Sequence, residues 1–420
     1  MDKLIINGGR PLRGKVRVSG AKNASLAILC ATIMAGDEVV LENIPDISDV
    51  RVVLEIIKHI GSEVIWLSES SLRIIAPTRI AADPPCDLVK KLRASNLLLG
   101  PMLARFGYAR VSLPGGCNIG VRPMDLHFKG LAGMGAQIDL DGGFAVGKIT
   151  RRLKGARIYL DFPSVGATEN IIMAACLAEG QTVLENVAKE PEIVDLANFL
   201  NCLGAKVRGA GTDVIKVEGV SQLGGCVRYA VIPDRIESGT FMVAAAATRG
   251  HLVLENVIPL HVEPICAKLR EAGVEVHEDN DMLTVNATGE LKPVDIKTMP
   301  YPGFPTDMQS QMMAFLSTVK GTSIIIENIF ENRFQIADEL KRMGANIKVE
   351  GRMAVVEGVA NLCGTRIKAT DLRAGAALVI AALMARGQTE ICNTHFIDRG
   401  YHMLEEKLSN LGVEIKRGQA

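Results

Sequence analysis

The pattern of apolar and polar positions repeats six times along the chain, at a period of roughly 70 residues, which is long enough for a small supersecondary module. Each copy has a glycine, a β-branched run typical of a strand, a loop, an amphipathic helical stretch, a second glycine and another short strand. The copies begin at Ala35, Gly107, Ala178, Arg249, Lys320 and Ala385. We therefore expect six similar α/β modules.

The amphipathic stretch of the first copy predicts a helix that ends at a glycine. Its apolar residues on one helical face are Val53, Ile56, Ile57 and Ile60. Gly61 follows, where a left-handed residue would end the helix. The equivalent glycines of the other copies are Gly135, Gly204, Gly273, Gly344 and Gly412.

A second helical stretch precedes each copy and is apolar nearly all round, as in residues 23–36 and 168–180. Such helices are expected inside a helix cluster. A β-α-β-α-type module cannot bury its sheet alone, so six modules predict an α/β protein of two bodies, each with three modules in pseudo-threefold arrangement.

The repeat phase predicts two domains that divide near residues 228–233. The first would span 22–229. The second would combine 1–21 with 230–420, because the strand-like residues 4–9 and 15–20 precede the first buried helix and would complete the other body.

Composition describes an ordinary globular protein, with 48% hydrophobic and 22% charged residues. The 47 basic and 47 acidic residues cancel, which argues against nucleic acid or an anionic membrane as a partner. The first residues lack an apolar run of signal-peptide length, and residues 376–385 are too short to cross a bilayer. Nine cysteines without a CxxC pair favour a reducing compartment, so we expect a cytoplasmic protein.

One stretch resembles a phosphate-binding loop but fails in detail. Residues 9–15 match its glycines and lysine, yet Val16 stands in place of the metal-binding Ser or Thr, Pro11 interrupts the loop, and a strand follows instead of a helix. The sequence also has no GxGxxG before a helix and no HExxH, and its histidines are scattered. Phosphate-loop hydrolysis, dinucleotide redox chemistry and zinc catalysis are therefore poorly supported.

Several arginines fall in the loops of the repeats. They are Arg93, Arg122, Arg333, Arg373 and Arg399. Each by itself could be a solvated surface charge. Equivalent loops of stacked repeats emerge at one end, however, so guanidinium groups from several copies can converge on a small substrate that carries phosphate and carboxylate. Lys22, at the start of a buried helix, would add an ammonium group near a helix N-terminus.

Cys117 lies in a glycine-rich loop, flanked by Gly116 and Asn118, unlike the cysteines with apolar neighbours. One alternative is a free surface thiol. Because Arg122 is close in sequence and favours the thiolate, we expect a reactive role.

Asp307 follows a loop rich in proline and glycine and precedes a stretch with helical spacing. Thr306 or Asp307 could simply cap that helix. A carboxylate presented to a cleft could instead act as general base for a sugar hydroxyl. The sequence leaves both roles open.

At these residues the chain resembles the UDP-N-acetylglucosamine 1-carboxyvinyltransferases, a family of enolpyruvyl transferases. The matching motifs lie at residues 19–24, 92–95, 114–127, 164–171, 190–200, 302–309, 330–334 and 371–375. The resemblance implies two inside-out α/β barrels of three modules each, with the active site in the cleft between them. It also implies no metal or organic cofactor, and a chain that closes on the UDP-sugar before phosphoenolpyruvate binds.

The resemblance further implies which residues bind each substrate. For phosphoenolpyruvate these are Lys22, Asn23, Arg122, Arg333, Arg373 and Arg399. For UDP-N-acetylglucosamine they are Asn23, Arg93, Arg122, Pro123, Met124, Asp125, Leu126, Ser164, Val165, Asp307 and Ile329. One position departs from the family, which often has a lysine where Phe162 stands, so a contact to the nucleotide phosphate would be lost or replaced.

By the same resemblance, the catalytic residues are Cys117, Asp307, Lys22 and Arg399. Asp307 would take the proton of the sugar 3-hydroxyl, and Cys117 would protonate C3 of phosphoenolpyruvate and react with fosfomycin. Lys22 and Arg399 would stabilise the departing phosphate. Two rival hypotheses remain, namely enolpyruvyl transfer to shikimate 3-phosphate and a catalytically silent scaffold that binds a nucleotide sugar or a regulatory protein.

Overall fold

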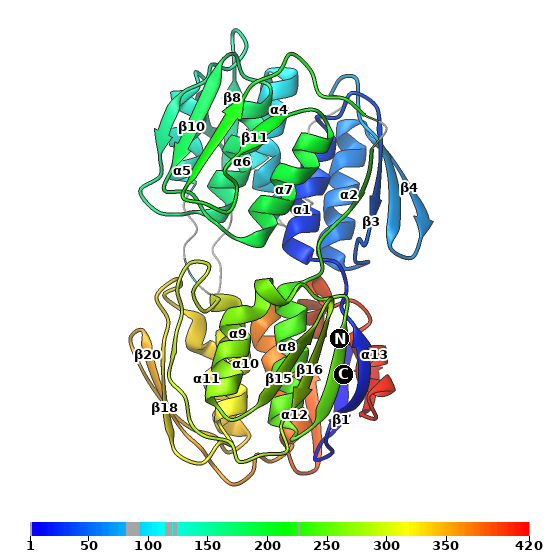
Figure 1. The fold of residues 1–420 in the computed structure, drawn as a ribbon, viewed down its shortest axis with the longest axis vertical. Helices are drawn as coiled ribbons and strands as arrows, with labels where there is room; N and C mark the ends of the chain where they lie inside the picture. Colours follow the sequence, from blue (N-terminus) through cyan, green and yellow to red (C-terminus); the bar gives the residue numbers. More distant parts are fainter. Residues whose placement is uncertain (1, 81–92, 114–119, 121–123, 226, 420) are drawn as a thin grey trace. The chain divides into compact units, whose positions relative to one another are not determined.

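The computed structural model describes residues 2–80, 93–113, 120, 124–225 and 227–419, without the side chains of 93–95. The chain forms two compact units (Figure 1). The described part of unit 1 is residues 2–19, 120 and 233–419, and that of unit 2 is residues 20–80, 93–113, 124–225 and 227–232. The units divide at 19/20 and 232/233, a few residues from the domain boundaries that the repeat predicts.

Unit 2 contains three sheets and a group of helices. Its helices are α1 (Lys22–Thr32), α2 (Ser48–Ile60), η1 (Arg93–Leu98), α4 (Leu99–Phe106), α5 (Asp125–Gly133), α6 (Val165–Cys176) and α7 (Pro191–Cys202). Its strands are β3 (Glu38–Glu42), β4 (Glu63–Ser68), β5 (Ser71–Ile75), β6 (Tyr108–Ser112), β7 (Gln137–Asp141), β8 (Phe144–Lys148), β9 (Arg157–Tyr159), β10 (Gln181–Glu185), β11 (Lys206–Arg208), β12 (Val214–Glu218) and β13 (Val227–Ala230). The strand orders are β13-β3-β5-β4, β6-β8-β7 and β11-β12-β10-β9.

Unit 1 also contains three sheets. Its helices are α8 (Arg235–Ala247), α9 (Pro259–Glu271), η2 (Thr306–Met308), α10 (Gln309–Leu316), η3 (Arg333–Gln335), α11 (Ile336–Arg342), α12 (Leu372–Met384), η4 (Thr394–Arg399) and α13 (Leu404–Asn410). Its strands are β1 (Asp2–Asn7), β2 (Arg13–Arg17), β14 (His251–Glu255), β15 (Glu275–Asp279), β16 (Met282–Asn286), β17 (Ile296–Lys297), β18 (Thr322–Ile326), β19 (Asn346–Glu350), β20 (Met353–Glu357), β21 (Arg366–Lys368), β22 (Gln388–Cys392) and β23 (Glu414–Gln419). The strand orders are β21-β22-β1-β23, β15-β16-β14-β2 and β17-β18-β20-β19.

Both units bury their apolar helices, as the sequence pattern predicts. All but one residue of α1 and every residue of α10 are buried, and α6, α8 and α12 are buried nearly all round. The strands instead alternate between buried and exposed residues, as in β14 and β20. Helices therefore form the centre of each unit, with one face of each sheet packed against them.

The first residues of the chain complete the sheets of unit 1. β1 pairs antiparallel with both β22 and β23, and β2 pairs parallel with β14. The strand-like residues before the first buried helix therefore share sheets with strands from the last two-fifths of the chain.

The glycines after the amphipathic helices have the predicted left-handed backbone. Their φ values run from 89° at Gly412 to 119° at Gly61. At Gly135 a Cβ would meet no atom within 4 Å, so the backbone angle alone favours glycine there.

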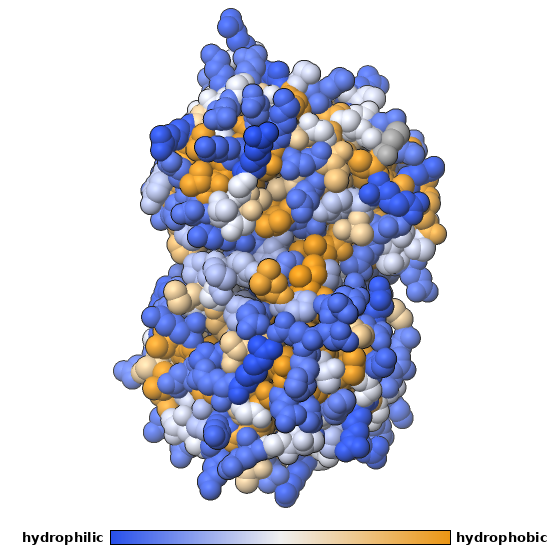
Figure 2. All heavy atoms as spheres, viewed as in Figure 1, coloured by the Kyte–Doolittle hydropathy of each residue, from blue (hydrophilic) through white to orange (hydrophobic). Residues whose placement is uncertain are grey.

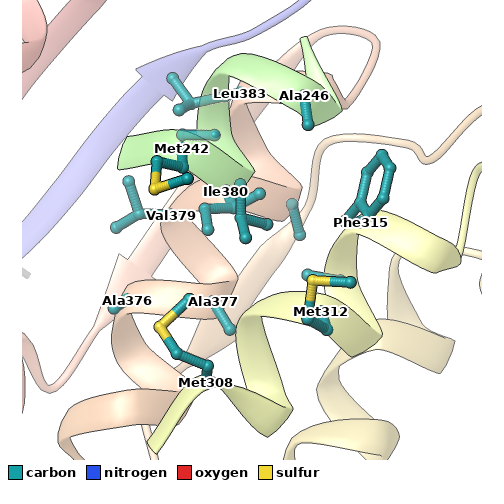
Figure 3. Packing of buried hydrophobic residues seen from close by; sticks show 14 of the residues in the cluster. Met242, Ala246, Met308, Met312, Phe315, Ala376, Ala377, Val379, Ile380 and Leu383 are labelled. Carbon is teal, nitrogen blue, oxygen red and sulfur yellow. The ribbon is translucent and has the colours of Figure 1, made fainter. Parts of the chain in front are cut away.

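Three helices meet in the core of unit 1. Met242 on α8, Phe315 on α10 and Ile380 on α12 belong to one buried cluster, with Ile380 between the other two in the view of Figure 3. Met308, the last residue of η2, is fully buried against Ala377 in the same cluster. Burial of a methionine side chain contributes about 1.5–3 kcal/mol, so this core fixes the short η2 helix.

No described helix combines the length and the apolar character needed to span a bilayer.

Candidate active site

The carboxylate of Asp307 lies between two arginine side chains of unit 1. Arg333 donates from Nη2 to Oδ1 of Asp307 at 2.8 Å, and Arg373 donates to Oδ2 from Nη2 at 2.8 Å and from Nε at 3.1 Å. The two arginine side chains are 2% and 5% exposed, whereas that of Asp307 is 25% exposed. The structure thus brings together three of the residues that the sequence places at the active site.

Local structure positions each of these side chains. Asp307 is the middle residue of η2, held by the buried Met308 beside it. Arg333 begins η3. Arg373 lies in the first turn of α12, where the side chain of Asp371 accepts hydrogen bonds from the backbone N–H groups of Arg373 and Ala374.

The structure bears on the two roles left open for Asp307. No side chain caps η2 or α10, whose N-cap residues are Pro305 and Met308. Both carboxylate oxygens of Asp307 accept from arginines instead. The capping interpretation, for Thr306 as for Asp307, is therefore wrong in this structure.

The arginines control the charge of Asp307. Burial by itself would raise its pKa, but the charges of Arg373 and Arg333 and their hydrogen bonds outweigh burial and hold the pKa well below its ordinary value. Asp307 is therefore an anion at neutral pH and, while both arginines bind it, a weak base.

The buried residue Glu327 is linked to Arg333 through the hydroxyl of Thr306. Arg333 donates to the hydroxyl of Thr306 at 2.8 Å, and that hydroxyl donates to Glu327 at 2.9 Å. Glu327 also accepts from Thr298 at 2.9 Å and from the backbone N–H of Ile329 at 2.9 Å. Ile329, predicted to line the sugar site, is thus held through the same carboxylate as Arg333.

Arg373 lies close to the aromatic ring of Tyr401, which follows η4 in the chain. Its guanidinium carbon is 5.9 Å from the ring centroid of Tyr401, whose hydroxyl is 2.8 Å from that of Thr240. The predicted residue Arg399 ends η4, which packs on α12, and it is half-buried.

Lys22 is the first residue of α1 in unit 2 and is nearly buried. Its Nζ forms an ion pair of 2.9 Å with Oδ2 of Asp49, in the first turn of α2, and the two side chains are 11% and 5% exposed. Asn23 follows and is half-buried. The ammonium group is therefore held in place at the N-terminus of α1 by a buried anion.

The predicted residues of the sugar site cluster where α5 and α6 begin. Met124 precedes α5, and Ser164 is the N-cap of α6, its hydroxyl accepting from Ala167 at 3.4 Å. The two helices are joined by His127, whose Nδ1 lies 2.9 Å from Nδ2 of Asn170. Burial lowers the pKa of His127 to about 4 against the opposing effect of Asp125, so the ring is neutral at pH 7. Asp125 is exposed, and Leu126 and Val165 are half-buried.

Phe162, where the family often has a lysine, is 48% exposed. Its carbonyl accepts from the backbone N–H of Ser164 at 2.7 Å. An exposed aromatic residue therefore lies two positions before Ser164, the N-cap of α6.

Part of the predicted site lies outside the described residues. Cys117, Arg122 and Pro123 belong to this part. Arg93 begins η1, which packs against α1, α2 and α6, and its side chain is likewise outside the described part.

The guanidinium group of Arg270 lies against the one group of side chains, among the described residues searched, that could hold a metal ion. Ligand atoms of Glu263, Cys266 and Glu278 lie within 4.8 Å of one another, the one such group among the residues searched in the described chain. Arg270 binds both glutamates, at 3.3 and 2.7 Å. Burial raises the pKa of Cys266 to about 12, which disfavours a metal-binding thiolate.

The sequence interpretation missed three supporting residues, which are Asp49, His127 and Glu327. His127 ends a matched motif, 114–127, and could have been named from it. Asp49 carries no signal in the sequence, because it lies 27 residues along the chain from Lys22. Glu327 lies only two residues before Ile329, but its contacts with Thr298 and Thr306 form between residues 29 and 21 positions apart.

Comparisons with known proteins agree over the whole length of the chain. The family model of EPSP synthase (3-phosphoshikimate 1-carboxyvinyltransferase) matches residues 6–408. A protein named UDP-N-acetylglucosamine 1-carboxyvinyltransferase 2 from Carboxydothermus hydrogenoformans is 56% identical over 419 residues, which cover 99% of each chain. One named UDP-N-acetylglucosamine 1-carboxyvinyltransferase 1 from Caldanaerobacter subterraneus is 55% identical over 415 residues, again 99% of each.

Solved structures extend the likeness to the fold. The enolpyruvyl transferase NikO from Streptomyces tendae has a TM-score of 0.89 at 27% identity, over 100% of this chain and 99% of that one. An EPSP synthase from Acinetobacter baumannii has a TM-score of 0.80 at 20% identity over the full length of both chains, which shows a common fold. The predicted two-domain α/β architecture is therefore confirmed.

Proposed function

This chain belongs to the EPSP synthase family of enolpyruvyl transferases and, within it, to the UDP-N-acetylglucosamine 1-carboxyvinyltransferases. We propose that it transfers the enolpyruvyl group of phosphoenolpyruvate to the 3-hydroxyl of UDP-N-acetylglucosamine and releases phosphate, the first committed step of peptidoglycan precursor synthesis. The relatives named for this reaction are 53–56% identical, whereas the EPSP synthase structures are 20% identical, which disfavours shikimate 3-phosphate as the acceptor.

The observation that carries the proposal is the group of Asp307, Arg333 and Arg373. Two nearly buried guanidinium groups that converge on a carboxylate are suited to bind the carboxylate of phosphoenolpyruvate bidentately. When the substrate takes over part of their hydrogen bonding, Asp307 loses the interactions that lower its pKa. Asp307 then becomes a stronger base, at the moment when a sugar hydroxyl needs one.

The proposed reaction has an addition and an elimination. In the addition, the sugar O3 attacks C2 of phosphoenolpyruvate, Asp307 takes the hydroxyl proton, and Cys117 gives its proton to C3. In the elimination, the thiolate of Cys117 takes a proton back from C3 while the C2–O bond to phosphate breaks, and the C2–C3 double bond forms again. Asp307 returns its proton to the phosphate or to solvent.

The positive charges that stabilise the leaving phosphate are proposed to be Lys22, Arg122 and Arg399. Lys22 is restrained by Asp49, so its ammonium group needs little reorganisation to meet an anion. No step in this scheme requires a redox or Lewis-acid group, since the protons move between side chains and substrate. The many cysteines without a CxxC pair favour the cytoplasm as the site of the reaction.

The UDP-sugar is proposed to bind where α5 and α6 begin. The described residues of unit 2 with that role that are exposed or half-buried are Asn23, Asp125, Leu126, Ser164 and Val165. Phe162 removes one ammonium contact, so we expect the nucleotide phosphates to depend more on Arg93 and Arg122.

Phosphate release with different acceptors tests the reaction. With phosphoenolpyruvate present, UDP-N-acetylglucosamine should support turnover and shikimate 3-phosphate should not. Activity with shikimate 3-phosphate alone would overturn the proposal, and binding of the UDP-sugar without any phosphate release would instead support the silent scaffold.

Labelling by fosfomycin tests the role of Cys117. We expect a single covalent adduct at Cys117 by mass spectrometry, and Cys117→Ser should lose both the adduct and nearly all turnover at neutral pH while it still binds the UDP-sugar. Cys202→Ser is the matched control, because Cys202 is an exposed thiol far along the chain from the motif. Full turnover of Cys117→Ser would refute the acid role.

A further inference from the structure

The edge strand β4 differs from the five strands that occupy the same place in the other modules. In every sheet the strand after the amphipathic helix lies at the edge, and the six are β4, β7, β11, β15, β19 and β23. Five of them expose mainly charged or polar residues, among them Asp139, Lys206, Arg208, Glu275, Asp279, Lys348, Glu350, Glu414 and Lys416. Such charges are a common protection of an edge strand. In β4, Ile65, Trp66 and Leu67 are instead exposed to 40%, 39% and 51%.

The exposed residues of β4 cover both of its faces. Side chains alternate along a strand, so Ile65 lies on one face and Trp66 on the other. Leu67 lies at a register shift between Trp66 and Ser68, where the regular alternation is interrupted. Trp66 lines a surface hollow of about 590 Å³ together with Leu54 and Glu55 of α2. Figure 1 shows β4 at the outer margin of its unit, and Figure 2 shows apolar side chains at that margin. β7 and β19 expose one large apolar residue each, Leu140 and Val349.

The backbone of β4 has an open edge. Among the described strands it pairs only with β5, so its outer N–H and C=O groups face away from the sheet. A globular partner that docked on a face of the sheet would cover the side chains on only one face of β4. An added strand covers the open edge and packs against the side chains of both faces at once.

The charges around β4 indicate the chemistry of such a strand. Arg51 forms an ion pair with Asp46, and Lys58 with Glu55, so these four charges at the rim of the hollow neutralise one another. Glu63 at the start of β4 and Glu69 just after its end are exposed and form no ion pair within the described part of the chain. The two ends of the strand are therefore acidic.

We propose that β4 is a docking site for an extended segment of another protein, apolar in its centre and with Lys or Arg at both ends. The segment would add to the sheet as a fifth strand beside β4. Its apolar residues would cover Ile65 on one face, Trp66 on the other and Leu67 at the register shift, and its basic ends would pair with Glu63 and Glu69.

A second copy of this chain does not satisfy the same surface. Antiparallel pairing of two β4 strands brings the end of each strand at Glu63 close to the end of the other at Glu69. Like charges directly across two strands are destabilising. Charge complementarity therefore favours a basic partner strand.

The test uses the full chain and two capped peptides, Lys-Val-Thr-Val-Ile-Val-Lys and the same sequence with Glu at both ends. Trp66 is the single tryptophan of the chain, so its fluorescence reports binding directly. We expect the basic peptide to shift the emission saturably, to slow hydrogen exchange of the amides of β4, and to bind more weakly as salt rises. The acidic peptide should do none of these.

Variants locate the site. The double variant Ile65→Thr with Leu67→Thr has β-branched residues, which favour a strand, at both positions. It should bind the basic peptide about tenfold or more weakly. Leu140→Thr, on the equivalent edge of β7, is the matched control and should leave the affinity unchanged. Unfolding in urea checks that both variants fold.

Three results would overturn the proposal. They are equal binding of the two peptides, equal loss of affinity in both variants, and an absence of exchange protection in β4. A concentration-dependent dimer in sedimentation that Ile65→Thr with Leu67→Thr abolishes would assign the surface to a second copy instead.

Discussion

Two carboxyl groups, one in each unit, have pKa values that are shifted in opposite directions. Asp307 in unit 1 has a pKa held well below 3.8, because Arg373 and Arg333 outweigh the effect of its burial. Glu169, on α6 of unit 2, is 4% exposed, and its pKa is raised well above 4.5 by burial and then by the negative charges of Glu192 and Glu190. Burial acts in the same direction on both groups, so their neighbours decide the difference.

The contrast separates the carboxylate that we propose as a base from one that is packed among helices. Asp307 remains charged and a quarter exposed, and in the proposed reaction its arginine partners exchange it for a substrate carboxylate. Glu169 favours the neutral form among α1, α6 and α7, where it also contributes to the raised pKa of Cys30. A perturbed pKa therefore points to function only when the perturbing groups are able to bind a ligand.

The largest effect is expected on turnover. Asp307→Asn keeps the shape of the side chain but removes the base, so phosphate release should fall by about 10²- to 10⁴-fold. Glu169→Gln is the same chemical change at a group with no part in the reaction, and its turnover should stay close to that of the unmodified chain. Equal losses of turnover in Asp307→Asn and Glu169→Gln would contradict the proposed difference in role between the two carboxyl groups.

A smaller effect is expected on stability when one guanidinium is removed. Arg373→Met leaves Asp307 with Arg333 as a partner, so the free energy of unfolding should fall by about 2 kcal/mol, less than the ~3–5 kcal/mol typical when a buried charge loses its only partner. Arg417→Met removes two more exposed ion pairs, to Asp398 and Glu405, and should cost about 1 kcal/mol or less. Urea unfolding measures both, and a larger loss for Arg417→Met would contradict the role of burial.

The smallest effect is a pair of opposite pH dependences of stability. The contribution of Asp307, whose pKa is lowered, is present above pH 3.8 and is lost as the pH falls through its folded pKa. The contribution of Glu169, whose pKa is raised, is present below pH 4.5 and is lost as the pH rises toward its folded pKa.

Unfolding free energies over pH 3 to 8 check these signs. The unmodified chain should lose stability relative to Glu169→Gln as the pH rises above 4.5, and relative to Asp307→Asn as it falls below 3.8. If the stability difference from the unmodified chain changed with pH in the same direction for both variants, the neighbouring charges would not shift the two pKa values as described.

The sequence determined the modules and their order, because a strand or a helix in this chain follows from local apolar spacing and from glycines that need a left-handed backbone. Gly61 and the buried helix α1 are two such elements. Motifs of the family also sufficed to name Asp307, Arg333 and Arg373, although their spacing along the chain gave no sign that one carboxylate joins them.

Only the tertiary structure decided what those side chains do. Asp307 could cap a helix or act as a base on its local sequence, and the choice depends on arginines 26 and 66 residues away. The ion pair of Asp49, the contact of Glu327 with Thr298 and the edge position of β4 have no local signature either, because they depend on which strands and helices meet in space. Local spacing sets backbone conformation, whereas electrostatic and edge interactions are set by distances that only the folded chain fixes.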